Sequence, residues 1–142
     1  MRIIGLDVGT KTIGVAVSDL TGSIAGGVTT IKRQSFDKDI NALKQIQHEY
    51  SPELIVIGLP KKMDGTIGEQ AIFVQNFGTK IEKALNIKIQ YMDERLTTVQ
   101  ASRILREANV SAKKQKNVID KQAAILILQS YLDKTKGEIK SE

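Results

Sequence analysis

The chain has 142 residues, a formal net charge of +5 and 41% hydrophobic residues, values typical of a single globular domain. It contains no cysteine and one histidine, His48, which argues against disulfides, thiol nucleophiles and histidine-rich metal sites. No apolar run approaches the roughly 20 residues of a membrane span. We therefore expect a cytoplasmic protein with no membrane partner. The positive charge indicates either an ordinary solvated surface or a polyanionic partner.

The first 19 residues predict a β-hairpin. Two apolar, β-branched runs flank a turn at 9–11, and because both runs are apolar on both faces, they are expected to be central strands. Ile3, Gly5 and Asp7 share one strand face by the period of two. A carboxylate in such a strand is costly unless it is hydrogen-bonded, paired or bound to a cation, so Asp7 needs partners elsewhere in the chain.

Three later segments predict further strands. Residues 26–31 follow a flexible turn, 54–58 form a short buried run typical of a parallel strand, and 87–91 alternate apolar and polar side chains up to Asp93. Between and after them, apolar residues recur at helical spacing. The expected helices are one opened by Ser35 and Asp37 and ended by Ser51-Pro52, one carrying Val74, Phe77, Ile81 and Leu85 on its apolar stripe, one begun by Thr97, and one over about 118–132.

This order of elements predicts an α/β fold. Strands 1–3 would form an antiparallel meander, and alternating helices and strands would complete a mixed five-stranded sheet covered by helices on both faces. Residues 1–133 are expected to form one domain, and 134–142, which lack an apolar pattern, a flexible tail.

Three acids fall where such a sheet could bring them together. Asp7 lies near the end of the first strand, Glu94 at or just beyond the end of the last, and Asp120 in the first turn of the final helix, on or beside its packing face. Clustered carboxylates repel unless cations screen them, and such hard oxygen ligands suit Mg²⁺ or Mn²⁺. The three acids are therefore candidate metal ligands.

Each acid also has a simpler interpretation. Asp7 could bond a backbone amide of its own turn, and Glu94 could be a solvated charge beside Arg95. Asp120 could be a first-turn acid favoured by the helix dipole. Asp93 is a rival to Glu94, because strand parity near a terminus is unreliable.

Basic side chains lie close in sequence to these acids, as a phosphate backbone near a metal centre would require. The alternative is a solvated surface. Aromatic residues make up only 4% of the chain, so recognition would rest on backbone and shape more than on base stacking. The candidate phosphate-binding residues are Lys11, Lys61, Lys62, Arg95, Lys113, Lys114 and Lys116.

Several motifs spread over almost the whole chain occur together: Gly5-Leu6-Asp7-Val8-Gly9-Thr10-Lys11, Ile13-Gly14-Val15-Ala16, Gly58-Leu59-Pro60, Met63-Asp64-Gly65-Thr66, Asp93-Glu94-Arg95-Leu96-Thr97-Thr98, and Asp120 with Ala123-Ala124. With them the chain resembles the YqgF-type (RuvX-like) family, whose members are labelled Holliday-junction resolvases or pre-16S rRNA nucleases. Thr12 departs from the usual pattern, in which a basic residue is common.

The resemblance implies a ribonuclease H-like fold and a two-metal phosphodiesterase, with Asp7, Glu94 and Asp120 as the catalytic acids holding two Mg²⁺ or Mn²⁺ ions. The resulting hypothesis is a nuclease that processes the 5′ end of precursor 16S rRNA, acting as a monomer or weak homodimer. The alternatives are a nuclease for branched DNA and a non-catalytic RNA-binding assembly factor. A nucleotide-binding protein of the actin or sugar-kinase type is disfavoured, because such proteins need two lobes of this fold.

Overall fold

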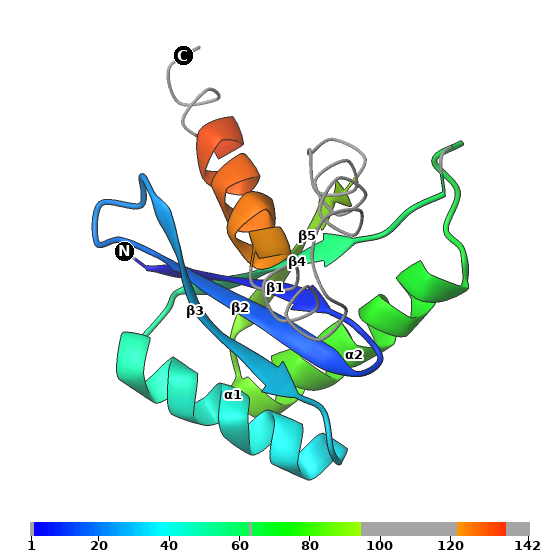
Figure 1. Ribbon diagram of the computed structural model, residues 1–142, viewed down its shortest axis with the longest axis horizontal. Coiled ribbons are helices and arrows are strands. Elements are labelled where there is room, and N and C mark those ends of the chain that lie inside the picture. Colours follow the sequence, from blue (N-terminus) through cyan, green and yellow to red (C-terminus); the bar gives the residue numbers. More distant parts are fainter. Residues whose placement is uncertain (1, 63, 95–121, 136–142) are drawn as a thin grey trace, which may run out of the picture.

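The computed structural model of the protein describes residues 2–62, 64–94 and 122–135 (Figure 1). Within this part of the chain, the order of elements agrees with the predicted meander followed by alternating helices and strands. The elements are β1 (Ile3–Val8), β2 (Thr12–Ser18), β3 (Ala25–Lys32), α1 (Phe36–Tyr50), β4 (Leu54–Leu59), α2 (Glu69–Leu85), β5 (Lys88–Asp93) and a helical segment over 122–135.

The strands form one mixed sheet in the order β3-β2-β1-β4-β5. β2 runs antiparallel to both of its neighbours, whereas β1, β4 and β5 run parallel to one another. The carboxyl ends of these three parallel strands therefore meet at one edge of the sheet. The predicted fold class is confirmed, including the central position of the hairpin strands β1 and β2.

Two apolar layers cover the two faces of the sheet (Figure 1). On one face, Ile4, Leu6 and Val8 pack with side chains of α1 and α2. On the other, Ile3 and β4 residues pack with the helical segment 122–135, drawn in orange and red in Figure 1. All six residues of β1 are buried, as expected for a strand covered on both sides.

Helix α1 begins as the sequence predicts. The hydroxyl of the N-cap Ser35 accepts a hydrogen bond from the backbone N–H of Lys38 at 3.2 Å, and Asp37 lies in the first turn, where the helix dipole favours a carboxylate. The helix ends at Tyr50, and Ser51 takes the left-handed conformation that terminates it before Pro52.

Some predicted segments fall outside the described residues. These are the helix begun by Thr97, the basic stretch that follows it and the start of the last helix. The described part of that last helix continues to residue 135, two residues into the expected tail, and 136–142 lie outside the described part. Within the described residues, no helix is both long and apolar enough to span a membrane.

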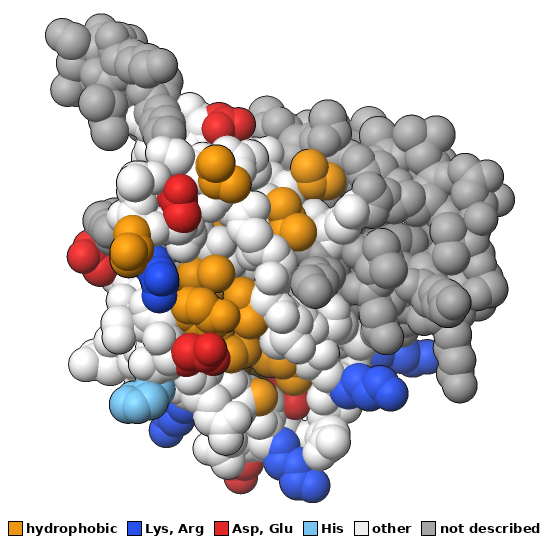
Figure 2. Space-filling view, turned by 60° about the vertical axis from the view of Figure 1, so that its left-hand side comes forward, with side chains coloured by type: hydrophobic (Ala, Val, Ile, Leu, Met, Phe, Trp, Pro, Cys, Tyr) orange, Lys and Arg blue, Asp and Glu red, His pale blue; other side chains and the backbone are white. Residues whose placement is uncertain are grey.

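The turn between β2 and β3 is organised by Asp19. Its carboxylate accepts hydrogen bonds from the backbone N–H groups of Ser23 at 2.8 Å and Ile24 at 3.3 Å, and from the hydroxyl of Thr21 at 3.0 Å. The bond from Ser23 is the main reason that the pKa of Asp19 lies below its ordinary value. The same turn exposes Leu20 and Ile24. In the view of Figure 2, hydrophobic side chains gather near the middle of the face, and Lys and Arg side chains lie at several separate places.

Small residues allow the helical segment 122–135 to approach the sheet closely. A Cβ atom at Gly5 would lie 2.7 Å from the Cβ of Leu128 and 3.1 Å from the backbone oxygen of Ala124. Neither neighbour is the end of a flexible side chain, so the helix would have to move. Gly5 is therefore required by packing rather than by backbone conformation.

We expect Gly5→Ala to destabilise the protein by about 1–3 kcal/mol, the usual cost of overpacking a filled core. Gly26→Ala is the matched control, since a Cβ there meets no atom within 4 Å. Its effect should stay within about 0.5 kcal/mol, as for other surface substitutions. Urea unfolding of both variants measures the difference, and equal midpoints would contradict this account of Gly5.

The lowered pKa of Asp19 predicts a pH-dependent contribution to stability. Because the folded pKa lies below the unfolded one, the contribution is present above the unfolded value of about 3.9 and is lost as pH falls through the folded value. Asp19→Asn should therefore be less stable than the parent protein at pH 7, and the gap should close in acid. Denaturant titrations across this pH range test this, and a gap independent of pH would contradict it.

Candidate active site

Two of the three predicted acids lie at the edge of the sheet where the parallel strands end. Asp7 is near the end of β1, and Glu94 directly follows β5. Asp7 projects from the same face as Gly5, which faces the helical segment 122–135. Glu94 lies two residues after Met92 and therefore on the same face of the strand, and Met92 packs in the apolar layer formed with the helical segment 122–135. Both carboxylates therefore belong to the side of the sheet covered by that segment.

Asp7 and Glu94 line one pocket of about 230 Å³. Asp7 is 8% exposed and Glu94 3% exposed, so both carboxylates are largely removed from solvent. Burial of two acids around one cavity is costly unless they are hydrogen-bonded, paired or bound to cations. The other lining residues are Val8, Gly9, Thr10, Lys11, Thr12, Gly58, Pro60, Gln70, Phe73 and Val74.

Gly58, near the end of β4, provides the space that Glu94 occupies. A Cβ atom at Gly58 would contact Cδ1 of Ile127 and lie 3.0 Å from Oε1 of Glu94. The residues that fill this space come from β4, the end of β5 and the helical segment 122–135. The position of the Glu94 carboxylate therefore depends on how these elements pack.

The structure separates Glu94 from its neighbour Asp93. Asp93 is not among the residues that line the pocket, and its carboxylate lies 3.9 Å from Nζ of Lys61. Register explains the difference, because Asp93 pairs with Leu59 while the next residue turns to the opposite face. Glu94 is thus the acid that shares a pocket with Asp7.

The donor set fits a hard divalent cation. Carboxylate oxygens are the ligands that Mg²⁺ and Mn²⁺ prefer, and Mg²⁺ needs only one or two of them in addition to water and phosphate oxygens. Asp7 and Glu94 supply this chemistry in one pocket. Residues 64–94 and the other described ranges contain no group of three acidic, histidine or cysteine ligands. The third predicted acid, Asp120, lies outside the described residues.

The predicted phosphate-binding residues are only partly described. Lys11 is exposed in the β1–β2 turn and lines the pocket. Lys61 and Lys62 line a neighbouring hollow that shares Pro60 and Gln70 with the pocket. Of these three lysines, Lys11 lines the pocket that holds the two acids, and the other two line the neighbouring hollow. Arg95, Lys113, Lys114 and Lys116 lie outside the described residues.

Sequence reasoning missed the contribution of α2 to the pocket. Gln70 and Phe73 come from its first two turns, and Phe73 is 37% exposed. The sequence offers one signal for this wall, the glycine-containing loop 64–68 that leads into the helix, but that loop points to no particular side chain. The structure thus adds Gln70, Phe73 and Val74 of α2 to the residues that line the pocket.

The comparisons with known proteins agree with this architecture. The sequence model of the RuvX family, described as "Holliday junction resolvase", matches residues 1–134, and the chain belongs to this family. Two curated relatives are named "Putative pre-16S rRNA nuclease". The one from Thermoanaerobacter pseudethanolicus is 56% identical over 139 residues, covering 97% of this chain and 100% of the relative. The one from Caldanaerobacter subterraneus subsp. tengcongensis is 54% identical over 138 residues, covering 96% and 99%.

Solved structures confirm the ribonuclease H-like fold. RuvC of T. thermophilus, in a complex with a Holliday junction substrate, matches with a TM-score of 0.58 and 10% identity, covering 96% of each chain. The fowlpox virus Holliday junction resolvase matches with a TM-score of 0.54 and 14% identity, covering 95% of this chain and 99% of the other. The resemblance to the YqgF-type (RuvX-like) family is thus confirmed.

Gly58 offers a direct test of the pocket. We expect Gly58→Ala to displace the Glu94 carboxylate and weaken Mn²⁺ binding, measured by paramagnetic broadening of NMR signals around the pocket. The expected loss of Mn²⁺ affinity is about tenfold, which corresponds to about 1.4 kcal/mol of binding free energy. Gly26→Ala, whose new methyl group meets open space, should bind Mn²⁺ like the parent protein. Unchanged binding in a folded Gly58→Ala variant would exclude this role for Glu94.

Proposed function

We propose that the protein is a metal-dependent nuclease that hydrolyses phosphodiester bonds, with precursor 16S rRNA as its substrate and the 5′ end as the site of processing. The observation that carries the proposal is the placing of two buried carboxylates, Asp7 and Glu94, in one pocket beside the exposed Lys11. The names of the curated relatives support the choice of substrate. The description of the family as "Holliday junction resolvase" supports nucleic acid as the substrate class.

The acids would hold the metal. Asp7 and Glu94, with Asp120 as the proposed third ligand, would bind two Mg²⁺ or Mn²⁺ ions through carboxylate oxygens. Bound there, divalent cations lower the pKa of coordinated water and stabilise charge on phosphoryl oxygens. This proposal includes the catalytic role of all three acids.

The remaining groups of the pocket would bind and orient the substrate. The ammonium group of Lys11 can neutralise a phosphate oxygen, and Arg95 is proposed to act in the same way. Lys61, Lys62, Lys113, Lys114 and Lys116 would contact flanking phosphates, which gives affinity without sequence preference. Val74 and Phe73 of α2 add an apolar wall to the same pocket.

The cellular context follows from the same proposal. We propose that the protein acts in the cytoplasm, and a chain without cysteine suits such a reducing compartment. We propose a single domain over residues 1–133 that acts as a monomer or weak homodimer, although its last helix continues to residue 135, two residues beyond this boundary.

A DNA nuclease for branched junctions is the second candidate. The description of the family, "Holliday junction resolvase", favours this second candidate. It would use the same acids, so the substrates must be compared side by side, with model precursor RNA and a four-way DNA junction at equal concentrations and in the same metal. Faster cleavage of the junction, together with a stable dimer in solution, would replace the rRNA proposal with this one.

Removal of single carboxylates tests the proposed site. We expect Asp7→Asn, Glu94→Gln and Asp120→Asn each to lower the rate of RNA cleavage by about a hundredfold or more, since a metal centre contributes several kcal/mol to transition-state stabilisation. Asp37→Asn, which alters an exposed acid on α1, should cleave at the parent rate. Omission of divalent metal should abolish cleavage in every variant. Activity that survives all three substitutions would refute the assignment.

A further inference from the structure

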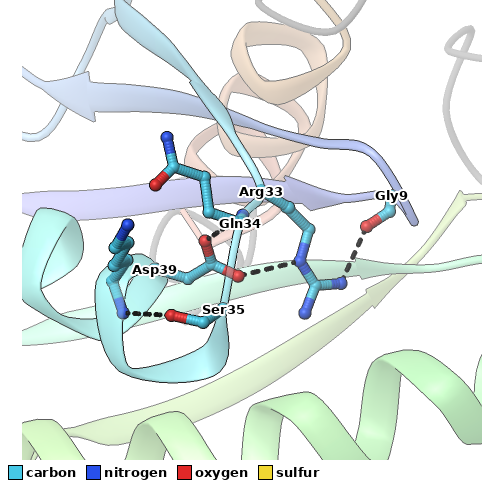
Figure 3. Close-up of polar contacts among 6 residues, drawn as sticks. Gly9, Arg33, Gln34, Ser35 and Asp39 are labelled. Atoms are coloured by element: carbon cyan, nitrogen blue, oxygen red, sulfur yellow. Dashed lines mark hydrogen bonds and ion pairs between the residues drawn. The ribbon is translucent and has the colours of Figure 1, made fainter.

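Arg33, which follows β3, joins the start of α1 to the β1–β2 turn (residues 9–11). Its Nε lies 3.2 Å from Oδ2 of Asp39, and its Nη1 donates a hydrogen bond to the backbone oxygen of Gly9 at 2.9 Å (Figure 3). Gly9 lines the candidate active site, whereas Arg33 and Asp39 do not. The guanidinium therefore contacts the β1–β2 turn, whose residues line the pocket, without lining the pocket itself.

The same residue holds the turn through its backbone. The N–H of Arg33 donates to the oxygen of Lys11 at 2.9 Å, and within the turn the N–H of Gly9 donates to the oxygen of Thr12 at 2.9 Å. Two carbonyl groups of the three-residue turn are thus bonded to Arg33, one by its backbone and one by its side chain. The backbone that presents the Lys11 side chain is fixed from outside the pocket.

The guanidinium is itself held in one orientation. Asp39 is only 2% exposed, and its second oxygen, Oδ1, accepts the backbone N–H of Gln34 at 3.1 Å. The ring of Phe77 lies 4.5 Å from Cζ of Arg33, and that of Phe73 lies 5.4 Å away. The planar guanidinium fork suits this combination of a carboxylate, a carbonyl and two rings better than an ammonium group. Its contacts thus reach α1, α2 and the hairpin.

We propose that Arg33 is a positioning residue of the active site, which fixes the β1–β2 turn so that Lys11 is presented to a phosphate next to Asp7. This inference rests on the proposed nuclease function. It assigns Arg33 no contact with the substrate: the residue acts through the turn, with Asp39 as its anchor. Small displacements of positioning groups are sufficient to slow a reaction, since an error of 1 Å can cost about a hundredfold in rate.

The alternative is that Arg33 only neutralises the buried charge of Asp39. Removal of one partner of a buried pair is destabilising in either case, so Arg33→Gln alone cannot separate the two roles. Arg33→Lys separates them, because lysine retains the charge beside Asp39 but cannot make the two directed bonds of the fork. If the role is purely electrostatic, Arg33→Lys should keep both the stability and the turn conformation of the parent protein. If Arg33 positions the turn, the variant should keep the stability but not the conformation of residues 9–11.

The experiment compares Arg33→Lys with Arg2→Lys in the full-length protein. Arg2 is a matched control, because its guanidinium also packs over an aromatic ring, at 5.5 Å from that of Tyr50, and it does not line the pocket. We expect Arg33→Lys to keep the parent unfolding midpoint and to lower kcat for RNA cleavage about tenfold to a hundredfold. In the metal-free protein, the amide signals of Gly9, Thr10 and Lys11 should shift and exchange faster with solvent. Arg2→Lys should change neither readout.

The two readouts distinguish failure of the inference from failure of the proposed function. Parent-like amide signals of residues 9–11 in folded Arg33→Lys would overturn the positioning role, whatever the enzyme cleaves. Parent-like kcat with altered signals would also overturn it, since the turn would then be irrelevant to catalysis. Absence of cleavage by the parent protein on both RNA and branched DNA would refute the nuclease function itself, and the proposed role of Arg33 in catalysis would fall with it.

Discussion

The burial of β1 on both faces is the constraint on which the rest of the site depends. With α1 and α2 on one side and the helical segment 122–135 on the other, a strand in this position carries apolar side chains along its length. A carboxylate is tolerated only near the end of the strand, where a pocket opens, and Asp7 occupies that place. The parallel pairing of β1 with β4, and of β4 with β5, brings Glu94 to the same edge. The convergence of the two acids is thus a consequence of sheet topology.

The same packing makes the site and the fold interdependent. Gly5 allows the helical segment 122–135 to lie close to the sheet, and Gly58 leaves room for both the Glu94 carboxylate and a side chain of that segment. A larger residue at Gly5 would displace the helix as a whole, whereas one at Gly58 would displace the acid directly. Substitution of a glycine on this interface can therefore affect both the stability of the fold and the geometry of the candidate site. Comparison of Gly5→Ala with Gly58→Ala separates the two effects.

Sequence reasoning found the parts of the site that depend on local pattern. The strand period of two placed Asp7 on one face of β1 together with Ile3 and Gly5, and the fold class followed from the order of strands and helices. It left Asp93 and Glu94 undecided, because the choice depends on the register between β5 and β4, which a strand end does not reveal. It gave no indication of the role of Arg33. The partner of this residue, Gly9, lies 24 residues away in the sequence, and the aromatic ring against which it packs belongs to α2. Contacts of this kind arise from tertiary packing and have no periodic signature.

The candidate metal-binding acids and the candidate phosphate-binding lysines are located on different parts of this fold. The acids are at strand ends, where the sheet fixes their spacing, while Lys11, Lys61 and Lys62 are on connections that can change without disturbing the sheet. Proteins with 10% and 14% identity share the fold, which shows that its core accepts extensive substitution. Under the proposed nuclease function, the choice between an RNA end and a branched DNA would depend on these connections. A mobile lysine would neutralise phosphate anywhere along a backbone, whereas one on a turn fixed by Arg33 can select a phosphate at a defined distance from the acids. Under the proposed function, rigidity of the β1–β2 turn is therefore expected to favour cleavage at one position in the substrate.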